Sequence, residues 1–170
     1  MYLNLIFELE LENMKLWDKG FSTDKKIDHF TVGNDRELDL HLAKYDVIAS
    51  KAHAKMLGKI GLLTPTETND LVKELDAIET TIEKGSFVIE DSFEDMHSKI
   101  EFILTEKLGD TGKKIHTARS RNDQVATDFR LWCRDTADHL LEALGQLKGE
   151  FIALAERELG TILPGYTHLQ

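Results

Sequence analysis

The chain of 170 residues has one cysteine, two prolines and no long apolar run. Because Cys133 is the single cysteine, an intramolecular disulfide is excluded, and a reducing compartment such as the cytoplasm fits best. Two prolines and 8% aromatic residues argue against a disordered chain or a repeat of β-hairpins. No segment reaches the roughly 18 apolar residues of a membrane span, so we expect no membrane partner.

The charge is strongly acidic, with 31 acidic and 21 basic residues and a formal net charge of −10. Nucleic acids and anionic membranes bind basic surfaces, so neither is an expected partner. Residues 112–124, Gly-Lys-Lys-Ile-His-Thr-Ala-Arg-Ser-Arg-Asn-Asp-Gln, are a basic exception that contains no acid before Asp123. Their basic side chains are Lys113, Lys114, Arg119 and Arg121. This cluster predicts a binding site for a small polyanion.

Apolar residues recur at helical spacing through almost the whole chain, which predicts an all-α fold without strands. We expect helices over about 38–60, 64–84 and 93–108, followed by a loop over 109–122. The second helix has the clearest start. Thr64 and Glu67 form the pattern of a capping box, and Pro65 suits the first helical position.

A long apolar stripe follows the loop and predicts one continuous helix from about residue 123 to 159. Its members are Val125, Phe129, Trp132, Thr136, Leu140, Leu144, Leu147, Phe151 and Leu154. Such a helix is roughly 50 Å long at 1.5 Å per residue. If the stripe stayed in water, the protein would lose on the order of 10–20 kcal/mol of hydrophobic stabilisation. We therefore expect the helix to pack in a bundle with later segments, other subunits, or both.

These patterns predict three parts: an N-terminal appendage at 1–14, a small helical domain at 15–122, and the first long helix of a helical-bundle domain at 123–170. The first residues lack the basic region of a signal peptide, and three glutamates interrupt their apolar run. The last residues do not have the composition of a frayed tail, so we expect the chain to be a fragment.

Two interpretations of residues 112–124 follow from the local pattern. Ser120 and Asp123 fit a capping box, so the segment could simply begin the long helix, with its arginines solvated. Alternatively, the free amides of a helix N-terminus and the neighbouring guanidinium groups would bind the carboxylates of a small ligand. Phosphate suits the segment less well, because residues 109–113 lack the glycine spacing and the Ser/Thr of a P-loop.

His97 and His168 are the candidate catalytic histidines. His97 shares a helix face with Glu101 and could form a hydrogen-bonded pair with it, although a lone helical histidine is more often structural. His168 follows a Pro-Gly turn beside Thr167, where an imidazole can serve as an acid or base near neutral pH. The seven histidines show no metal-ligand spacing, so we expect no metal.

Three segments together resemble argininosuccinate lyase, a family of the fumarase/aspartase superfamily. Residues 116–128 are similar to its His-Thr-x-Arg-Ser-Arg-Asn-Asp-Gln signature and the residues that follow it. Residues 95–98 resemble its Asp-Ile/Met-His segment, and residues 164–170 resemble its Pro-Gly-Tyr-Thr-His-Leu-Gln segment. The segments occur in family order, and the similarity runs from about residue 15 to 170. The Ser-Arg-Asn-Asp-Gln motif distinguishes this family from fumarase, aspartase and adenylosuccinate lyase.

The resemblance implies a β-elimination in arginine biosynthesis, in which the tricarboxylate argininosuccinate gives arginine and fumarate without a cofactor. His168 would take part in proton transfer, and His97 would be a second active-site histidine. The substrate-binding residues that it implies are Ser120, Arg121, Asn122 and Thr167, with Arg119 in support, and Asp39. Asp39 taken alone is equally typical of a solvated acid on a helix face. Members of the family are homotetramers with a central helical bundle, and three subunits contribute to each active site.

The sequence departs from the family pattern in several places. The family's Leu-Trp-Gly-Gly-Arg-Phe is here Leu-Trp-Asp-Lys-Gly-Phe at 16–21, and no clear equivalent of a substrate-binding serine exists near 31–37. The 170 residues also lack the Gly-Ser-Ser loop that carries the serine usually assigned as the catalytic base, so we expect them to be inactive alone. A non-catalytic scaffold protein of the same fold, as lens δ-crystallins are, and a remnant of a truncated gene remain alternatives.

Overall fold

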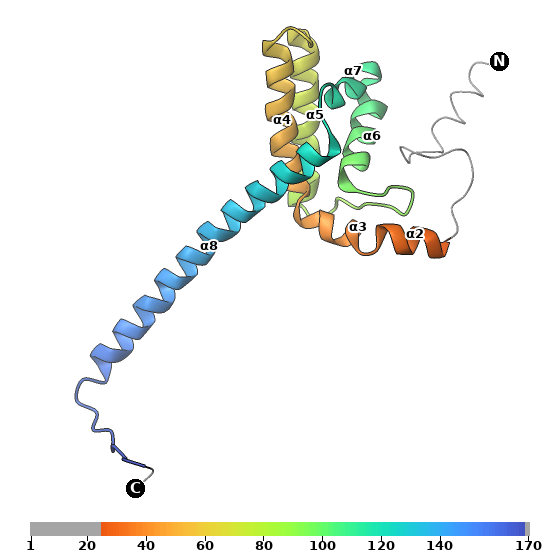
Figure 1. Ribbon diagram of the computed structural model, residues 1–170. Coiled ribbons are helices and arrows are strands. Elements are labelled where there is room, and N and C mark those ends of the chain that lie inside the picture. Colours follow the sequence, from red (N-terminus) through yellow and green to blue (C-terminus); the bar gives the residue numbers. More distant parts are fainter. Residues whose placement is uncertain (1–24, 169–170) are drawn as a thin grey trace, which may run out of the picture. The chain divides into compact units, whose positions relative to one another are not determined.

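The computed structural model describes residues 25–168 and contains no strand in that range (Figure 1). The all-α prediction is therefore confirmed for this part of the chain. The predicted appendage and the departure at 16–21 lie outside the described residues. The elements, in chain order, are α2 (Lys25–Val32), α3 (Asp35–Leu38), the 3₁₀ turn η1 (Asp39–His41), α4 (Ala43–Lys59), α5 (Pro65–Glu83), α6 (Met96–Leu108), α7 (Asp110–Lys113), the 3₁₀ turn η2 (Lys114–His116) and α8 (Arg121–Arg157).

The chain divides into two compact units, Met1–Trp132 and Cys133–Gln170, with the boundary inside α8. The first unit contains every element up to the first turns of α8. The second contains the rest of that helix and the segment after it. The predicted domain boundary at residue 122 is not tested by this division and stays a prediction.

The hydrophobic core of the first unit lies between α4, α5 and α6, which pack on one another. Its largest fully covered apolar side chains are Leu57 of α4, Leu71 and Leu75 of α5, and Met96, Ile100 and Leu104 of α6. Each such side chain contributes roughly 1.5–3 kcal/mol by leaving water. The helical spacing of these residues is what allows each helix to present one continuous apolar face.

Helix α5 begins and ends as its sequence predicts. Thr64 Oγ1 accepts a hydrogen bond from the amide of Glu67 at 3.2 Å, and Glu67 Oε2 accepts one from the amide of Thr64 at 2.8 Å. This is the predicted capping box, with Pro65 in the first turn. Gly85, two residues after the last helical residue, has a φ of +67°, a conformation that glycine adopts without a steric cost.

The predicted helix over 38–60 is interrupted at its start, because α3 and η1 precede α4. A tertiary contact holds this interruption: Asp39 Oδ2 accepts a hydrogen bond from the backbone amide of Met96 at 3.0 Å. The helix predicted over 93–108 begins at Met96 instead, because Asp95 caps it. Its Oδ1 accepts a hydrogen bond from the amide of Ser98 at 2.7 Å.

The segment 109–122 is not a plain loop, because it contains α7 and η2. Helix α7 packs directly against α6 at Gly112. A Cβ atom at that position would lie 2.2 Å from the carbonyl oxygen of Leu104. The close approach of the two backbones therefore requires a residue without a side chain, which a search for apolar periodicity cannot detect.

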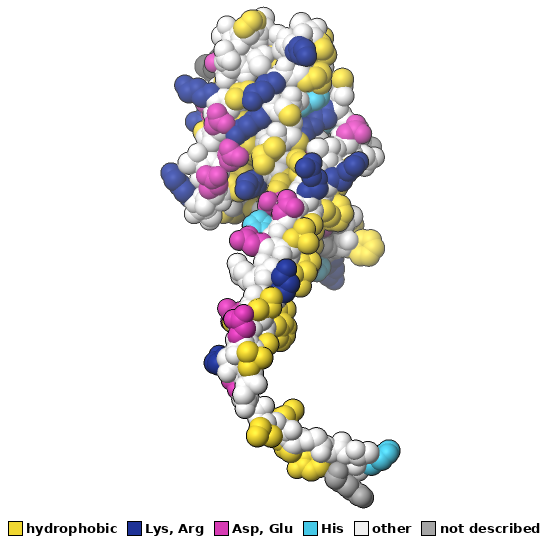
Figure 2. All heavy atoms as spheres, turned by 90° about the vertical axis from the view of Figure 1, so that its left-hand side faces the viewer, with side chains coloured by type: hydrophobic (Ala, Val, Ile, Leu, Met, Phe, Trp, Pro, Cys, Tyr) yellow, Lys and Arg dark blue, Asp and Glu magenta, His cyan; other side chains and the backbone are white. Residues whose placement is uncertain are grey.

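Helix α8 has 37 residues, and its bounds lie two residues before those predicted at both ends. No helix among the described residues is long and apolar enough to cross a membrane. Most of the predicted apolar stripe is exposed in this chain, and Figure 2 shows its side chains in yellow along the helix. Its exposed large members are Val125, Phe129, Leu140, Leu144, Leu147, Phe151 and Leu154.

Candidate functional site

The basic segment is neutralised by acids of the first unit. Every one of its four cationic side chains lies within 4 Å of a carboxylate. The pairs are Lys113 with Asp110, Lys114 with Glu67, Arg119 with Asp46, and Arg121 with Glu101. The expectation of solvated arginines is wrong, because only 8% of the Arg119 side chain and 22% of the Arg121 side chain are exposed.

The capping box predicted at the start of α8 is present in one half, because the Ser120 side chain accepts from the amide of Asn122 and not from that of Asp123. The amide of Ser120 donates to Asp123 Oδ2 at 3.2 Å, and Ser120 Oγ accepts from the amide of Asn122 at 3.2 Å. Just before the cap, Ala118 has a φ of +54°. This conformation costs an alanine roughly 1–2 kcal/mol, so the surrounding contacts must hold the turn in place.

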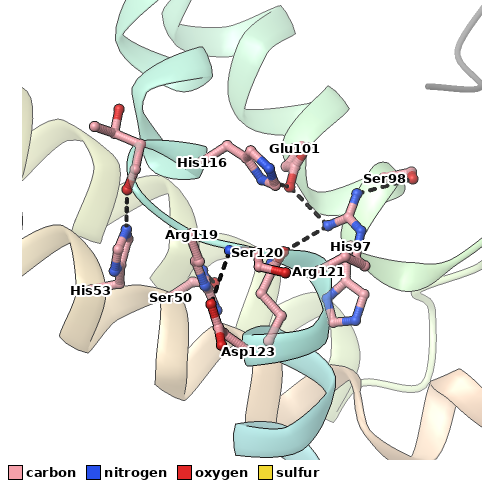
Figure 3. A network of polar contacts seen from close by, with 12 residues as sticks. Ser50, His53, His97, Ser98, Glu101, His116, Arg119, Ser120, Arg121 and Asp123 are labelled. Atoms are coloured by element: carbon pink, nitrogen blue, oxygen red, sulfur yellow. Dashed lines mark hydrogen bonds and ion pairs between the residues drawn. The ribbon is translucent and has the colours of Figure 1, made fainter. Parts of the chain in front are cut away.

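Glu101 of α6 joins the two ends of this turn (Figure 3). Its Oε1 accepts hydrogen bonds from His116 Nδ1 at 3.0 Å and from Arg121 Nη1 at 2.9 Å. Arg121 Nη1 also donates to Gln124 Oε1 at 2.8 Å, and Nη2 lies 3.4 Å from Ser98 Oγ. The guanidinium group thus connects the first turn of α8 to α6.

His97 is buried beneath the start of α8 and is 2% exposed. The expected pair of His97 with Glu101 is wrong, because His97 Nδ1 lies 3.0 Å from Oδ1 of Asp46 on α4 instead. Asp128 of α8 is fully buried beside them, with Oδ2 3.9 Å from His97 Nδ1. A tertiary contact therefore replaces the local pair that helical spacing suggested.

Arg119 completes this buried cluster from the turn before α8. Its Nη1 donates to Ser50 Oγ at 2.8 Å, and its Nη2 lies 3.5 Å from Asp46 Oδ1. Gln124 Nε2 is directed at the same carboxylate oxygen from 3.4 Å. The cluster consequently links α4, α6, the turn and α8.

The environment shifts the pKa values of the buried groups in different directions. Burial raises the pKa of Asp128 to about 7, and the charge of Asp46 adds to the rise. Burial also opposes ionisation of Asp46, but the hydrogen bond and charge of His97 and the charge of Arg119 outweigh it, so its pKa is lowered. Burial lowers the pKa of His97, but the hydrogen bond and charge of Asp46 outweigh burial and leave that pKa raised.

Among the described residues, Asp46, His97 and Asp128 are the one group whose potential metal-ligand atoms all lie close together, within 4.8 Å. The arrangement does not suit a cation. Oδ1 of Asp46 already faces the imidazole, the Gln124 amide and the Arg119 guanidinium group, and a positive charge next to a divalent cation is repelled. We therefore regard the cluster as a hydrogen-bonded one.

The remaining predicted residues fall in two places. Asp39 is half-buried against the first amide of α6, and burial raises its pKa, so the interpretation as a solvated helix-face acid is wrong. Ser120 and Asn122 are exposed at the start of α8. Thr167 and His168 belong to the second unit, where both are exposed and His168 has a φ of +54°.

Several residues of this network had no predicted role: Asp46, Ser50, Glu101 as the partner of Arg121, His116, Gln124 and Asp128. Gln124 and Asp128 are four residues apart and lie beside the apolar stripe, not on it. Both are buried. Their spacing places these two polar residues on one face of the first turns of α8, and this was the feature of the sequence that could have predicted their burial.

Comparison with known proteins places this chain in a family. A family model described as lyase matches residues 20–170. The chain belongs to this lyase family. An argininosuccinate lyase of Bacteroides thetaiotaomicron is 51% identical over 156 residues, which are 92% of this chain and 35% of that protein.

Other relatives of the chain carry the same name. The argininosuccinate lyase of Thioalkalivibrio sulfidiphilus is 47% identical over 92% of the chain and 33% of that protein. The chloroplastic argininosuccinate lyase of Arabidopsis thaliana is 44% identical over 94% of the chain and 31% of that protein. The resemblance to this family is thus confirmed, and the chain spans about a third of the length of these relatives.

Proposed function

We propose that this chain provides part of an argininosuccinate lyase, which cleaves argininosuccinate to arginine and fumarate by β-elimination. The similarity to argininosuccinate lyases over 92% of the chain carries the proposal. In the proposed reaction a base removes a proton beside a carboxylate, charge accumulates on that carboxylate, and the guanidine leaves. Fixed hydrogen-bond donors lower the barrier most where that charge develops.

The start of α8 is the proposed place for a substrate carboxylate. Ser120 and Asn122 are exposed there, and the first amides of a helix carry a partial positive charge of roughly half a unit. Arg121, which is paired with Glu101, adds a guanidinium group close by, and the nearly buried Arg119 supports the turn from beneath. Thr167 would bind substrate, His168 would transfer a proton, and His97 and Asp39 would complete the site.

We propose a cytoplasmic homotetramer with a small-molecule tricarboxylate substrate. The exposed stripe of α8 supports association, because about seven large apolar side chains in water cost the isolated chain on the order of 10 kcal/mol. Packing four such helices together would cover them. The single cysteine supports a reducing compartment.

A chimera tests the proposal. Residues 1–170 are joined to the complementary portion of the Bacteroides thetaiotaomicron relative, and arginine and fumarate are assayed separately. We expect the two products in equal amounts, whereas the 170 residues alone should form neither. Asn122→Ala should lower turnover by about a hundredfold, because a donor near the developing charge is lost.

Asn69→Ala is the matched control, since Asn69 is exposed on α5 and has no proposed role. It should leave turnover unchanged. A folded, tetrameric chimera that forms neither product would contradict the proposal and favour a non-catalytic scaffold.

A further inference from the structure

Three helices bring one buried carboxylate–imidazole cluster together beneath the start of α8. Asp46 of α4, His97 of α6 and Asp128 of α8 are 1%, 2% and 0% exposed. Oδ1 of Asp46 is the centre, because it faces the imidazole at 3.0 Å, the Gln124 amide at 3.4 Å and the Arg119 guanidinium group at 3.5 Å.

Three of the four carboxylate oxygens of Asp46 and Asp128 have no hydrogen-bond donor in the described part of the chain. Within the described residues, Oδ2 of Asp46 and both oxygens of Asp128 are buried without a hydrogen-bond partner. An ionised carboxylate left in this state costs several kcal/mol. A proton bound within the cluster would both remove a negative charge and supply the missing donor.

The charges balance when the cluster holds one such proton. Asp46 and Arg119 cancel each other as an ion pair. His97 and Asp128, whose Nδ1 and Oδ2 are 3.9 Å apart, then sum to zero if together they hold one ionisable proton. When Asp128 carries it, the proton lies in the side-chain hydrogen bond between Asp128 and Asp46. Losing that proton leaves a net negative charge in the interior, and gaining a second leaves a net positive one. Both states are unfavourable away from water.

We infer that Asp46, His97 and Asp128 form a buried proton-sharing cluster that positions the first two turns of α8 and the exposed residues 120–122. Gln124 transmits this effect, because its Nε2 faces Asp46 while its Oε1 accepts a hydrogen bond from Arg121. In this account His97 is a positioning residue. The part that concerns ligand binding rests on the proposed function, but the proton-sharing itself does not.

The charged groups that face the cluster come from every element around it. They are Asp39 of η1, Asp46 of α4, His97 and Asp95 of α6, Arg119 of the turn, and Arg121 and Asp128 of α8. Asp95 and Arg121 lie 3.5 Å apart and offset each other. Asp39 adds a negative charge near His97, which favours a proton on the cluster.

The sign of the pH dependence follows from the pKa shifts. The pKa of Asp128 is raised to about 7, so the folded chain keeps a proton that the unfolded chain releases near 3.8, and stability falls as pH rises between these values. The raised pKa of His97 acts in the same direction: its contribution is full below 6.5 and is lost as pH rises through the folded pKa. The lowered pKa of Asp46 acts oppositely, and its contribution is lost only as pH falls below 3.8.

The test compares the 170-residue chain with Asp128→Asn in urea unfolding across the neutral pH range. Asparagine keeps the shape of the protonated acid and cannot lose the proton. Between pH 6 and 8 the unfolding constant of the unsubstituted chain should rise about tenfold relative to that of Asp128→Asn. Asp138→Asn, an exposed site on the same helix, should follow the unsubstituted chain.

The NMR signal of the Nε–Hε group of Arg121 gives a second readout. With Asp128 present it should shift with the same pH midpoint as unfolding stability, and in Asp128→Asn it should not shift. Equal pH dependence of the two chains would overturn the inference, as would a loss of stability on adding a chelator, which would show a bound cation. If Asp128→Asn does not fold, NMR titration of the Asp128 carboxyl carbon and the His97 imidazole in the unsubstituted chain decides. Loss of one proton from the pair near pH 7 supports the inference, whereas an Asp128 midpoint of about 4 with a neutral His97 overturns it. No substrate is used, so a failed lyase assay and a failed titration are distinguishable.

Discussion

Arg121 and Glu101 are joined by a hydrogen bond of 2.9 Å between Nη1 and Oε1, and only 22% and 25% of their side chains are exposed. The guanidinium group that the family resemblance assigns to a substrate carboxylate therefore holds a carboxylate of its own chain. The same glutamate oxygen also accepts a hydrogen bond from His116. A ligand carboxylate would meet a cation that is already positioned, at the cost of competing with Glu101 for it.

We predict that Glu101→Gln destabilises the first unit by about 1 kcal/mol, because glutamine keeps the shape but loses both charge-assisted hydrogen bonds. Partial exposure keeps the cost small. Urea unfolding measures it. Glu106→Gln, exposed on the same helix, should stay within about 0.5 kcal/mol of the parent chain. Equal stabilities of the two variants would show that the Glu101 contacts contribute nothing.

The cap of α5 gives a prediction about local structure. Thr64→Ala removes the side-chain acceptor of the Glu67 amide and should cost about 1 kcal/mol. Thr66→Ala, exposed one residue into the helix, is the control and should be nearly neutral. Thermal unfolding, monitored by circular dichroism, compares the stabilities of the two variants. A Thr64→Ala chain as stable as the parent would contradict the role of the cap.

Gly112→Ala should be strongly destabilising, because the new Cβ would lie 2.2 Å from a backbone oxygen that cannot move away. We expect a loss of about 3 kcal/mol or more, measured by chemical unfolding. Gly149→Ala is the matched control, since no described atom lies within 4 Å of a Cβ there. Its position inside α8 should make it neutral or stabilising by up to about 1 kcal/mol. A well-folded Gly112→Ala chain would show that α7 does not pack against α6 this closely.

The exposed stripe of α8 predicts self-association. Leu147→Glu places a charge on the stripe and should shift the chain toward monomer in sedimentation velocity experiments. Gln146→Glu makes the same charge change at the preceding exposed position, so it should behave more like the parent. A parent chain that sediments as a clean monomer at all concentrations would count against the bundle.

Local features of the fold were predictable because neighbouring residues produce them. The capping box at Thr64 and Glu67 and most of α8 depend on contacts within one or two helical turns, which spacing alone reveals. The interruption near Asp39 and the helical turns within 109–122 were not predicted. Both depend on contacts with α6, namely the Met96 amide at Asp39 and the backbone of Leu104 at Gly112.

The candidate site divides in the same way. The sequence by itself determined that the chain is all-α, that its longest helix begins close to residue 123, and that the chain resembles argininosuccinate lyases. Only the tertiary structure decided which acid pairs with which base. Arg121 and Glu101 are 20 residues apart, Arg119 and Ser50 are 69 apart, and Gln124 and Asp46 are 78 apart. Helical periodicity specifies the face on which a charge lies, but its partner depends on how the helices pack, and burial then determines whether that charge is retained.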